Sequence, residues 1–258
     1  MAVERRVRSG ARGYPDPVRR KSSLVVIPAY NEEEALPATL AELVEIRPDL
    51  DVVVISDGSV DKTAALARAA GVHVIDLPFN LGIGGALQTG FRYAERAGYE
   101  RAFQFDADGQ HDPRELAALE AGLDAGANLV IGSRFGDGTV EYKVGPLRRF
   151  AMRVLGWSVN RLSRQSFSDT SSGFRGFDAS MLHYFAGAYP VEFMDSTESL
   201  LLACFAGFRV SEVPTRIRKR SAGQPSTRNV RLILNYLRLL VVIVGHVSRP
   251  RRDRKALS

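Results

Sequence analysis

The sequence predicts an α/β fold in which a mainly parallel sheet is flanked by helices. Two observations support this fold class. Short apolar runs alternate with amphipathic stretches of about ten to fifteen residues through the first half of the chain, which is typical of βαβ units. The chain also has 258 residues, of which 45% are hydrophobic and 25% charged, so it is long enough for one large domain with a substantial core.

The elements can be placed in order along the chain. Strands are expected at residues 24–27, 51–55, 72–75, 101–105 and 129–132. Helices are expected between them at residues 33–47, 61–70, 85–97 and 113–124, the second stopped by Gly71 and the last opened by Pro113. After residue 135 the alternation is lost, and we expect helices at about 147–164, 178–187 and 196–206 and a strand near 208–213.

Polar loops follow each of the first four predicted strands, at residues 28–32, 56–61, 79–85 and 106–111. In a parallel sheet the carboxyl ends of the strands lie along one edge, and ligands bind there. We therefore expect these four loops to form one site.

The most informative loop contains Asp106 and Asp108, which follow the apolar run 102–105 directly. In extended backbone, residues two apart point to the same side. Two hard carboxylate ligands at a strand end suit Mg²⁺ or Mn²⁺, which also binds substrate phosphates. The alternative interpretation is a loop that collects Asp and Gly because these residues form turns.

A glycine-rich segment at residues 80–86 looks like a dinucleotide-binding loop, but its spacing does not fit. Leu87 stands where the third glycine of such a loop belongs, and the segment follows the third strand instead of the first. A nicotinamide-dependent enzyme is therefore excluded, and these glycines are better explained by close packing of the loop against a nucleotide or the carboxylate loop.

The formal net charge of +6 is concentrated in two tails. Residues 1–21 carry +5 and residues 249–258 carry +4, which leaves the body between them at −3. We expect 1–21 to be a disordered basic arm and 249–258 a basic tail, both suited to an anionic surface. Nucleic acid is excluded as a partner because no recognition module accompanies the arginines. The single cysteine, Cys204, rules out a disulfide within the chain and fits a reducing cytosol.

Residues 228–248 predict an amphipathic helix. Its polar stripe consists of Arg228, Arg231, Asn235, Arg238 and Gly245, and most of the remaining positions are apolar. An arginine near the centre of a spanning helix would cost roughly 2.5–3.5 kcal/mol, whereas a helix lying in the membrane interface avoids that cost. Docking on the chain's own domain, or on a small membrane protein partner, is the alternative. No secretory signal is evident, and no apolar run reaches the roughly 18 residues of a spanning helix.

Five short blocks in order along residues 24–220 resemble those of the inverting family 2 glycosyltransferases, which have the Rossmann-like GT-A fold. The blocks lie at residues 27–32, 55–61, 80–84, 106–111 and 172–175. The resemblance is strongest to the branch that contains dolichol-phosphate mannose synthase and bacterial polyprenyl-phosphate glycosyltransferases. It implies a GT-A domain at 22–227, with a nucleotide-sugar half at 22–135 and an acceptor half at 136–227.

The resemblance also implies roles for individual residues. The nucleotide sugar would be bound by Pro28, Ala29, Tyr30, Glu32, Asp57, Gly84 and Asp106. A Mg²⁺ or Mn²⁺ ion on the diphosphate would be held by Asp106, Asp108 and Gln110. One departure from the family pattern is Ser56, where many members have a second aspartate.

The acceptor determines which further residues the chemistry needs. A lipid phosphate is already largely ionised near neutral pH and needs cations to hold it, for which Arg134 and Arg175 are candidates. A sugar hydroxyl would need a carboxylate base, for which Asp169, Asp195 and Glu198 are candidates; an acid at Glu198 could instead orient an arginine. A basic loop with Arg216, Arg218, Lys219 and Arg220 could close over the diphosphate or contact lipid head groups.

Together these patterns predict a metal-dependent inverting transferase that moves a sugar from a nucleotide diphosphate sugar to a polyprenyl phosphate. We expect it to be cytoplasmic and peripheral at the inner face of the plasma membrane. One alternative is transfer to a sugar hydroxyl in the assembly of cell-surface polysaccharide or glycolipid. A membrane scaffold that binds nucleotide sugars without turnover is the non-enzymatic alternative, which the intact Asp106 and Asp108 pair disfavours.

Overall fold

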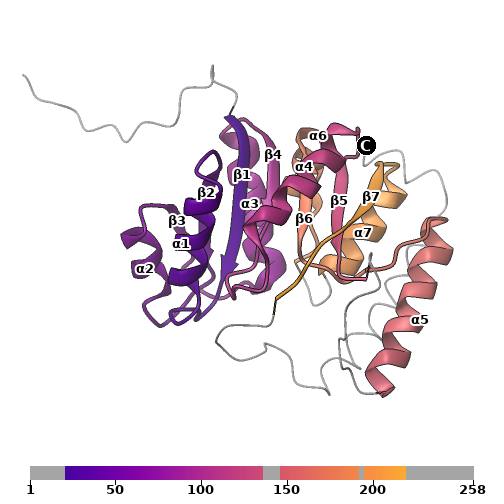
Figure 1. Ribbon diagram of the computed structural model, residues 1–258, viewed down its shortest axis with the longest axis horizontal. Coiled ribbons are helices and arrows are strands. Elements are labelled where there is room, and N and C mark those ends of the chain that lie inside the picture. The colour runs from indigo at the N-terminus through magenta and orange to yellow at the C-terminus, as the bar shows by residue number, and fades with distance from the viewer. Residues whose placement is uncertain (1–20, 136–145, 192–194, 219–258) are drawn as a thin grey trace, which may run out of the picture.

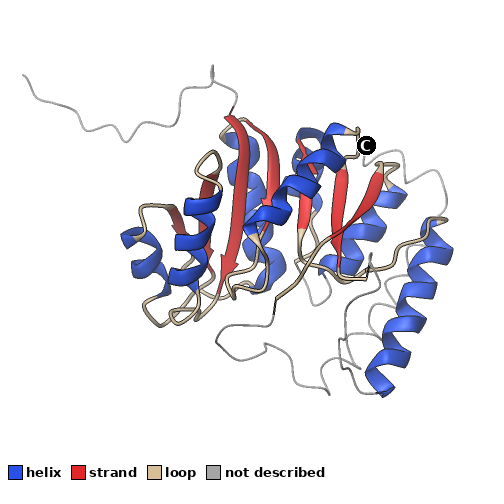
Figure 2. Cartoon of the chain, viewed as in Figure 1, coloured by secondary structure: helices blue, strands red, loops and turns tan. Residues whose placement is uncertain are grey.

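The computed structural model describes residues 21–135, 146–191 and 195–218, which form a seven-stranded sheet flanked by helices (Figures 1 and 2). The strands lie in the order β3-β2-β1-β4-β6-β5-β7. Their bounds are β1 (Lys21–Ala29), β2 (Asp51–Ser56), β3 (His73–Asp76), β4 (Tyr99–Gln104), β5 (Leu129–Ser133), β6 (Arg175–Asp178) and β7 (Val210–Pro214). All pairings are parallel except those of β6, which runs antiparallel to both β4 and β5.

Helices cover both faces of this sheet. Their bounds are α1 (Leu36–Ile46), α2 (Thr63–Ala69), α3 (Gly82–Arg96), the 3₁₀ turn η1 (Pro113–Glu115), α4 (Leu116–Asp124), α5 (Pro146–Ser163), α6 (Ala179–Ala188) and α7 (Asp195–Phe205). Buried side chains of α1, α2 and α4 pack on one face, and those of α3, α5, α6 and α7 pack on the other. The sheet is therefore the middle of three layers.

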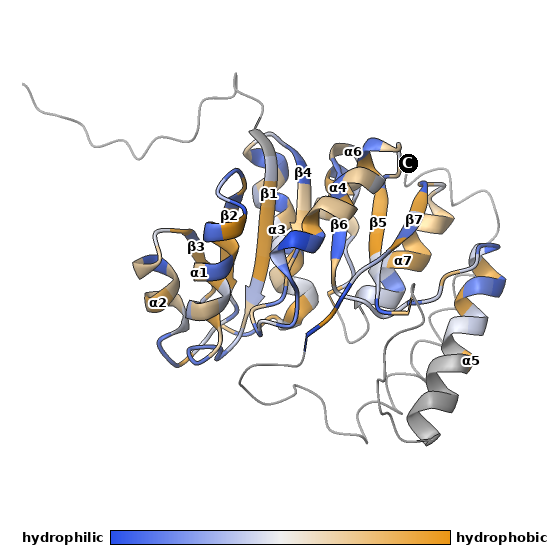
Figure 3. Ribbon diagram, in the orientation of Figure 1, coloured by the Kyte–Doolittle hydropathy of each residue, from blue (hydrophilic) through white to orange (hydrophobic). Residues whose placement is uncertain are grey.

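The apolar runs of the sequence form strands because both of their faces are buried. In β1, Leu24 and Val26 point into one core cluster, whereas Val25 and Ile27 point into the other. Figure 3 shows β1 and β5 as mainly hydrophobic ribbons between the helical layers. A strand buried on both faces has no polar alternation, which explains the continuous Val and Ile runs.

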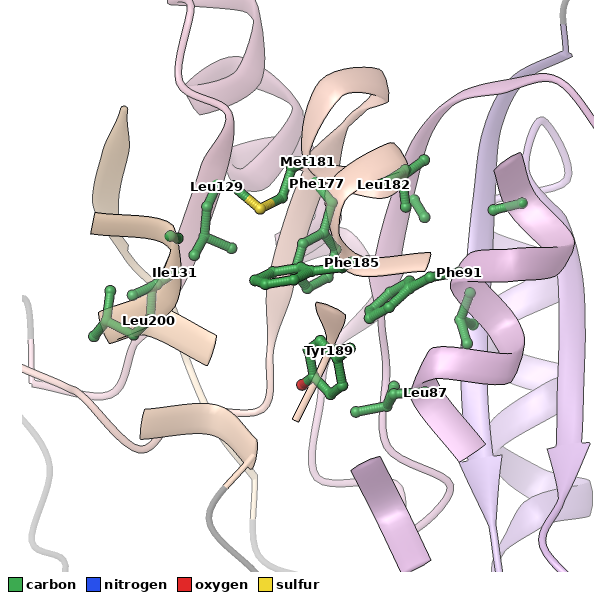
Figure 4. Packing of buried hydrophobic residues seen from close by; sticks show 14 of the residues in the cluster. Leu87, Phe91, Leu129, Ile131, Phe177, Met181, Leu182, Phe185, Tyr189 and Leu200 are labelled. Atoms are coloured by element: carbon green, nitrogen blue, oxygen red, sulfur yellow. The ribbon is translucent and has the colours of Figure 1, made fainter. Parts of the chain in front are cut away.

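Aromatic rings dominate the cluster on the α3 and α6 side (Figure 4). The ring of Phe91, on α3, lies with its centroid 4.8 Å from that of Phe177 and 5.1 Å from that of Tyr189. Phe185 packs edge-on against both Phe177 and Tyr189. These contacts join α3 of the first half of the chain to β6 and α6 of the second half. Both halves therefore share one core.

The predicted fold class is confirmed, with one correction. Strand β6 was not predicted, because Arg175-Gly176-Phe177-Asp178 has charged residues at both ends and no apolar run. It inserts between β4 and β5 and runs antiparallel to both. The strand predicted near 208–213 is β7. Residues 1–20 of the predicted arm, the basic tail, the helix predicted at 228–248 and Arg220 lie outside the described residues, whereas Lys21, the last residue of that arm, is the first residue of β1.

No helix within residues 21–135, 146–191 and 195–218 is long and apolar enough to cross a membrane.

Candidate active site

The loops that follow β1, β2 and β3 contact one another at the carboxyl edge of the sheet, as predicted. The amide N–H of Asp57 donates to the Ala29 carbonyl at 2.8 Å, and that of Val60 donates to Asn31 Oδ1 at 2.9 Å. A Cβ built on Gly58 would lie 2.5 Å from the backbone nitrogen of Asn80, so only glycine allows this approach. The three loops form one continuous wall.

The residues expected to bind the nucleotide lie along this wall. Tyr30 is 50% exposed, Pro28 and Glu32 are half-buried, and Ala29 is buried. The amide of Glu32 donates to Thr63 Oγ1 at 2.9 Å, which links the first loop to α2. The side chain of Tyr30 is therefore accessible at the edge where a nucleotide is expected to bind.

Asp57 connects the second loop to the beginning of α3. Its Oδ1 accepts the Leu81 N–H at 2.7 Å, and the neighbouring Gly82 N–H donates to Asn80 Oδ1 at 3.0 Å. Burial raises the pKa of Asp57, although these backbone donors act in the opposite direction. The Asp57 carboxylate thus caps the start of α3. The contact with the nucleotide base that the resemblance implies would use the same carboxylate.

Gly84 lies in α3 but faces the second half of the chain. A Cβ at this position would lie 2.2 Å from the Pro190 carbonyl oxygen and 2.8 Å from Val191 Cα. The glycine therefore allows α3 to approach the segment that follows α6. This is packing between the two halves, and the contact of Gly84 with the nucleotide sugar that the resemblance implies stays a prediction.

The carboxylate loop follows β4. The side chain of Asp106 is 32% exposed, and Asp108 is 7% exposed. Asp108 Oδ1 accepts the Gln110 N–H at 3.0 Å, and the Ala107 carbonyl accepts the Thr39 hydroxyl at 3.0 Å. The loop is therefore held to α1 as well as by its own turn.

His111 supports Asp106 and was given no role in the sequence analysis. Its Nδ1 accepts the Asp106 N–H at 3.2 Å, and its Nε2 lies 3.5 Å from Asp106 Oδ2. Burial, together with the positive charge of Arg134, lowers the pKa of His111 to about 4, against the attraction of Asp108. Because Nδ1 is the acceptor, the neutral ring carries its proton on Nε2, toward Asp106. The sequence feature that could have indicated this supporting role is the position of His111 within the block at residues 106–111.

The donors of this loop fit a hard divalent cation. Asp106 and Asp108 contribute carboxylate oxygens, and the Gln110 Nε2 donates to the Arg218 carbonyl at 3.4 Å, which leaves the amide oxygen on the other side of the group. Among the residues that the structure describes, no three His, Cys, Asp or Glu side chains are grouped closely enough to hold a metal alone. A divalent cation at this loop would therefore need further oxygen ligands besides these side chains.

Gly173 brings the 172–175 block against the carboxylate loop. A Cβ at Gly173 would lie 3.1 Å from Gln104 Nε2 and 3.5 Å from both carboxylate oxygens of Asp106. The next residue, Phe174, places its ring centroid 4.7 Å from that of His111. Two blocks far apart in the sequence therefore pack together, because β6 inserts beside β4.

Arg175 requires a correction. It is 0% exposed, and it donates from Nε to the Ser172 carbonyl at 2.8 Å and from Nη1 to Ser199 Oγ at 2.9 Å. A guanidinium in this position holds β6 and α7 together inside the domain and is not placed to meet a lipid phosphate. The sequence could not show this, because the same residue would serve either role.

Arg134 is held at the end of β5. Its Nε donates to Asp169 Oδ2 at 2.6 Å and its Nη2 to Asp169 Oδ1 at 2.8 Å. Asp169 is 1% exposed; burial opposes its ionisation, but hydrogen bonds and charge from Arg134 outweigh burial and lower its pKa. Since both oxygens are engaged by Arg134, Asp169 is not placed to act as a general base. Glu198 is half-buried in the first turn of α7, and the side chain of Asp195 is outside the described part.

Arg218 is anchored beside the carboxylate loop. Its Nη1 donates to both carboxylate oxygens of Glu42 at 2.8 Å, and its Nη2 donates to Asp112 at 2.5 Å. Its backbone N–H donates to the Gln110 carbonyl at 2.9 Å. The basic loop thus begins from a fixed point next to Gln110.

The fold and this edge define a GT-A glycosyltransferase. The family model described as glycosyl transferase family 2 matches residues 24–185, and the chain belongs to that family.

Two curated relatives and one crystal structure illustrate the similarity. Polyprenol monophosphomannose synthase of Mycolicibacterium smegmatis is 33% identical over 238 residues, which is 86% of this chain and 88% of that protein. Undecaprenyl-phosphate mannosyltransferase of Micrococcus luteus is 32% identical over 216 residues, which is 78% of this chain and 85% of that protein. The crystal structure is that of glucosyl-3-phosphoglycerate synthase from Mycobacterium tuberculosis in complex with Mn²⁺, UDP and phosphoglyceric acid. It superimposes with a TM-score of 0.65 and a sequence identity of 17%, over 89% of this chain and 80% of that one.

Proposed function

We propose that this glycosyltransferase moves a sugar from a nucleotide diphosphate sugar to a polyprenyl phosphate, with inversion at the anomeric carbon. The observation that carries the proposal is the engagement of Asp169 by Arg134. The acid of the second half that the structure defines best is already occupied by an arginine, and that arginine follows β5 on the same edge of the sheet as the carboxylate loop. This arrangement suits an anionic acceptor, which needs a cation more than a base. The names of the two curated relatives support the same acceptor.

The reaction is a single displacement. An oxygen of the acceptor phosphate forms a bond to the anomeric carbon while the bond from that carbon to the nucleoside diphosphate breaks, and the electron pair leaves with the diphosphate. Because the acceptor is already ionised near neutral pH, no proton has to be removed from it. A Mg²⁺ or Mn²⁺ ion held by Asp106, Asp108 and Gln110 would neutralise the departing diphosphate.

The protein's own residues position the reactants. The wall formed by the first three loops would bind the nucleoside, with Tyr30 against the base and Asp57 within its hydrogen-bonding range. The neutral His111 holds Asp106 through its backbone N–H and faces its carboxylate. Arg134 would bind the acceptor phosphate. Arg218, fixed by Glu42 and Asp112, anchors the loop that carries Arg220.

We further propose that the enzyme is cytoplasmic and acts peripherally at the inner face of the plasma membrane. The acceptor lipid resides in the membrane, and the sequence of 228–258 combines an amphipathic pattern with a basic tail. The membrane surface, or a small membrane protein, would be the partner of that segment. Deletion of 228–258 should release the protein from membranes; retention would contradict this assignment.

A transfer assay tests the acceptor and names the donor. Purified protein and undecaprenyl phosphate would be mixed with Mn²⁺ or Mg²⁺ and a panel of labelled sugar nucleotides. GDP-mannose comes first, since two relatives are named for mannose transfer. Label that enters the organic phase and is abolished by EDTA supports the proposal. Metal-dependent donor binding without lipid product would favour transfer to a sugar hydroxyl, with Glu198 as the base to test. Donor binding with neither product would favour a scaffold.

A further inference from the structure

The guanidinium of Arg134 is held in one plane by a single carboxylate. Asp169 accepts from Nε at 2.6 Å and from Nη2 at 2.8 Å, and its Oδ2 also accepts the backbone N–H of Arg134 at 3.2 Å. Ser171 Oγ accepts a further bond from Nη2 at 2.6 Å. A two-point contact between a planar fork and a carboxylate fixes direction as well as distance. These bonds therefore fix the direction in which the Arg134 guanidinium points as well as its position.

The segment that carries Asp169 is itself held by a second carboxylate. Glu212, on β7, accepts the backbone N–H groups of Ser168 and Asp169, each at 2.7 Å. Ser168 Oγ lies 2.7 Å from Ser133 Oγ, at the end of β5. The segment is thus fixed between β7 on one side and the end of β5 on the other. Bending Asp169 away from Arg134 would break these bonds.

The oriented guanidinium lies at the end of β5, on the same edge as the carboxylate loop. Arg134 follows β5 directly, and β5 pairs with β6, which pairs with β4. The side chain of Arg134 is 19% exposed, so part of it reaches the surface of this edge.

We propose that Asp169 is a positioning residue, which holds Arg134 in the orientation that binds the phosphate of the acceptor, with Glu212 holding Asp169 in turn. This inference rests on the proposed function, because it assigns the acceptor's anion to Arg134. It replaces the expectation that Asp169 is a general base.

The test compares Asp169→Asn with the wild type in the intact enzyme. Asparagine keeps the size of the side chain but cannot accept with both terminal atoms. The Michaelis constant for undecaprenyl phosphate is expected to rise roughly 10- to 100-fold, because a hydrogen bond to a charged group contributes about 1.5–3 kcal/mol. The Michaelis constant for the donor should change less than about twofold, since the donor binds elsewhere on the edge. The matched control is Asp124→Asn, which removes the acid at the end of α4 that pairs with Arg101 of β4.

A second measurement reports on Arg134 without turnover. Phenylglyoxal modifies arginine side chains, and the rate at Arg134 can be followed by mass spectrometry of its peptide. Release from Asp169 should speed that modification several-fold in Asp169→Asn and leave it unchanged in Asp124→Asn. Combining Asp169→Asn with Arg134→Lys should raise the acceptor constant no further than Arg134→Lys does alone, because Asp169 acts through Arg134.

The outcomes separate the possible roles of Asp169. A fall in kcat with an unchanged acceptor constant would restore the general-base role and overturn the proposal. Weaker binding of both substrates, with a lower melting temperature and unchanged modification of Arg134, would leave Asp169 a structural residue only. The proposal would also be overturned if the effects of the two substitutions on the acceptor Michaelis constant add in the double variant. If the wild type makes no lipid product, the proposed function fails by itself, and the modification rate still decides whether Asp169 orients Arg134.

Glu212→Gln provides a second variant in case Asp169→Asn does not fold. It leaves the Asp169 and Arg134 side chains intact but deprives one backbone N–H of Ser168 or Asp169 of its acceptor. A several-fold rise in the acceptor constant with an unchanged donor constant is expected. An unchanged acceptor constant would remove Glu212 from the arrangement.

Discussion

The two sides of the candidate active edge, which we propose bind the nucleotide and the acceptor, are built in different ways. On the proposed nucleotide side, the loops after β1, β2 and β3 are joined by several separate hydrogen bonds, among them Asp57 N–H to the Ala29 carbonyl and Val60 N–H to Asn31 Oδ1. On the acceptor side, Arg134 meets Asp169 through a buried ion pair between segments 35 residues apart. A wall held by several separate bonds can lose one of them and keep its shape, whereas the orientation of Arg134 depends on one particular carboxylate. We therefore expect the acceptor side to be the more sensitive to conservative changes.

The largest effect is expected at the boundary between the two sides, where Asp108 lies. Asp108→Asn removes a carboxylate from the loop that would hold the diphosphate and its ion, so kcat should fall roughly 10²- to 10³-fold. The fold should remain intact, because an asparagine can still accept the Gln110 N–H. Transfer rates and circular dichroism check this. Asp49→Asn, on an exposed aspartate paired with Arg47, should retain full activity; equal losses in both variants would refute the assignment.

The next largest effect concerns the packing of the two halves. Gly84→Ala would force its Cβ against the Pro190 carbonyl, and overpacking of this kind typically costs about 1–3 kcal/mol in the free energy of unfolding. Chemical denaturation measures it. Gly187→Ala, on α6 with open space around the new Cβ, should be neutral or slightly stabilising. If Gly84→Ala is equally harmless, α3 does not approach residues 190–191 as closely as described.

The ion pair of the acceptor side predicts a particular acid sensitivity. The pKa of Asp169 is lowered in the folded state, so its contribution to stability is complete above its unfolded pKa, about 3.9, and is lost as pH falls through its folded pKa. Asp169→Asn should therefore be destabilised relative to wild type at pH 7, with the difference shrinking below about pH 4. Unfolding curves at several pH values measure this. A difference independent of pH would mean that the carboxylate charge is not involved.

The smallest effect is expected at the anchor of the basic loop. Glu42→Gln weakens an ion pair whose side chains are 37% and 34% exposed, and such pairs contribute less than about 1 kcal/mol. Stability should hardly change, because Asp112 still pairs with Arg218. A modest fall in transfer rate, without a change in melting temperature, would show that the anchor matters for the loop. Glu45→Gln, on the same helix, is the control.

Much of the nucleotide side could be predicted from residues close in sequence. The strand-loop-helix order and the spacing of Asp106 and Asp108 placed four loops on one edge. The same reasoning missed β6, because Arg175 and Asp178 hide a strand with a single large apolar residue, Phe177. It also did not show that Gly84 packs against residues 190–191, since a glycine pattern does not indicate which neighbour needs the space.

The sequence by itself determined the α/β class, the edge that carries chemistry and the carboxylates on it, because these follow from local periodicity and from the rule that parallel strands end together. Only the tertiary structure decided which arginine is buried and which is oriented. Arg175 and Arg134 have the same chemistry, and their roles differ because β6 carries one into the interior while β5 delivers the other to the edge beside Asp169. Burial and pairing arise from contacts between distant segments, which no local pattern encodes.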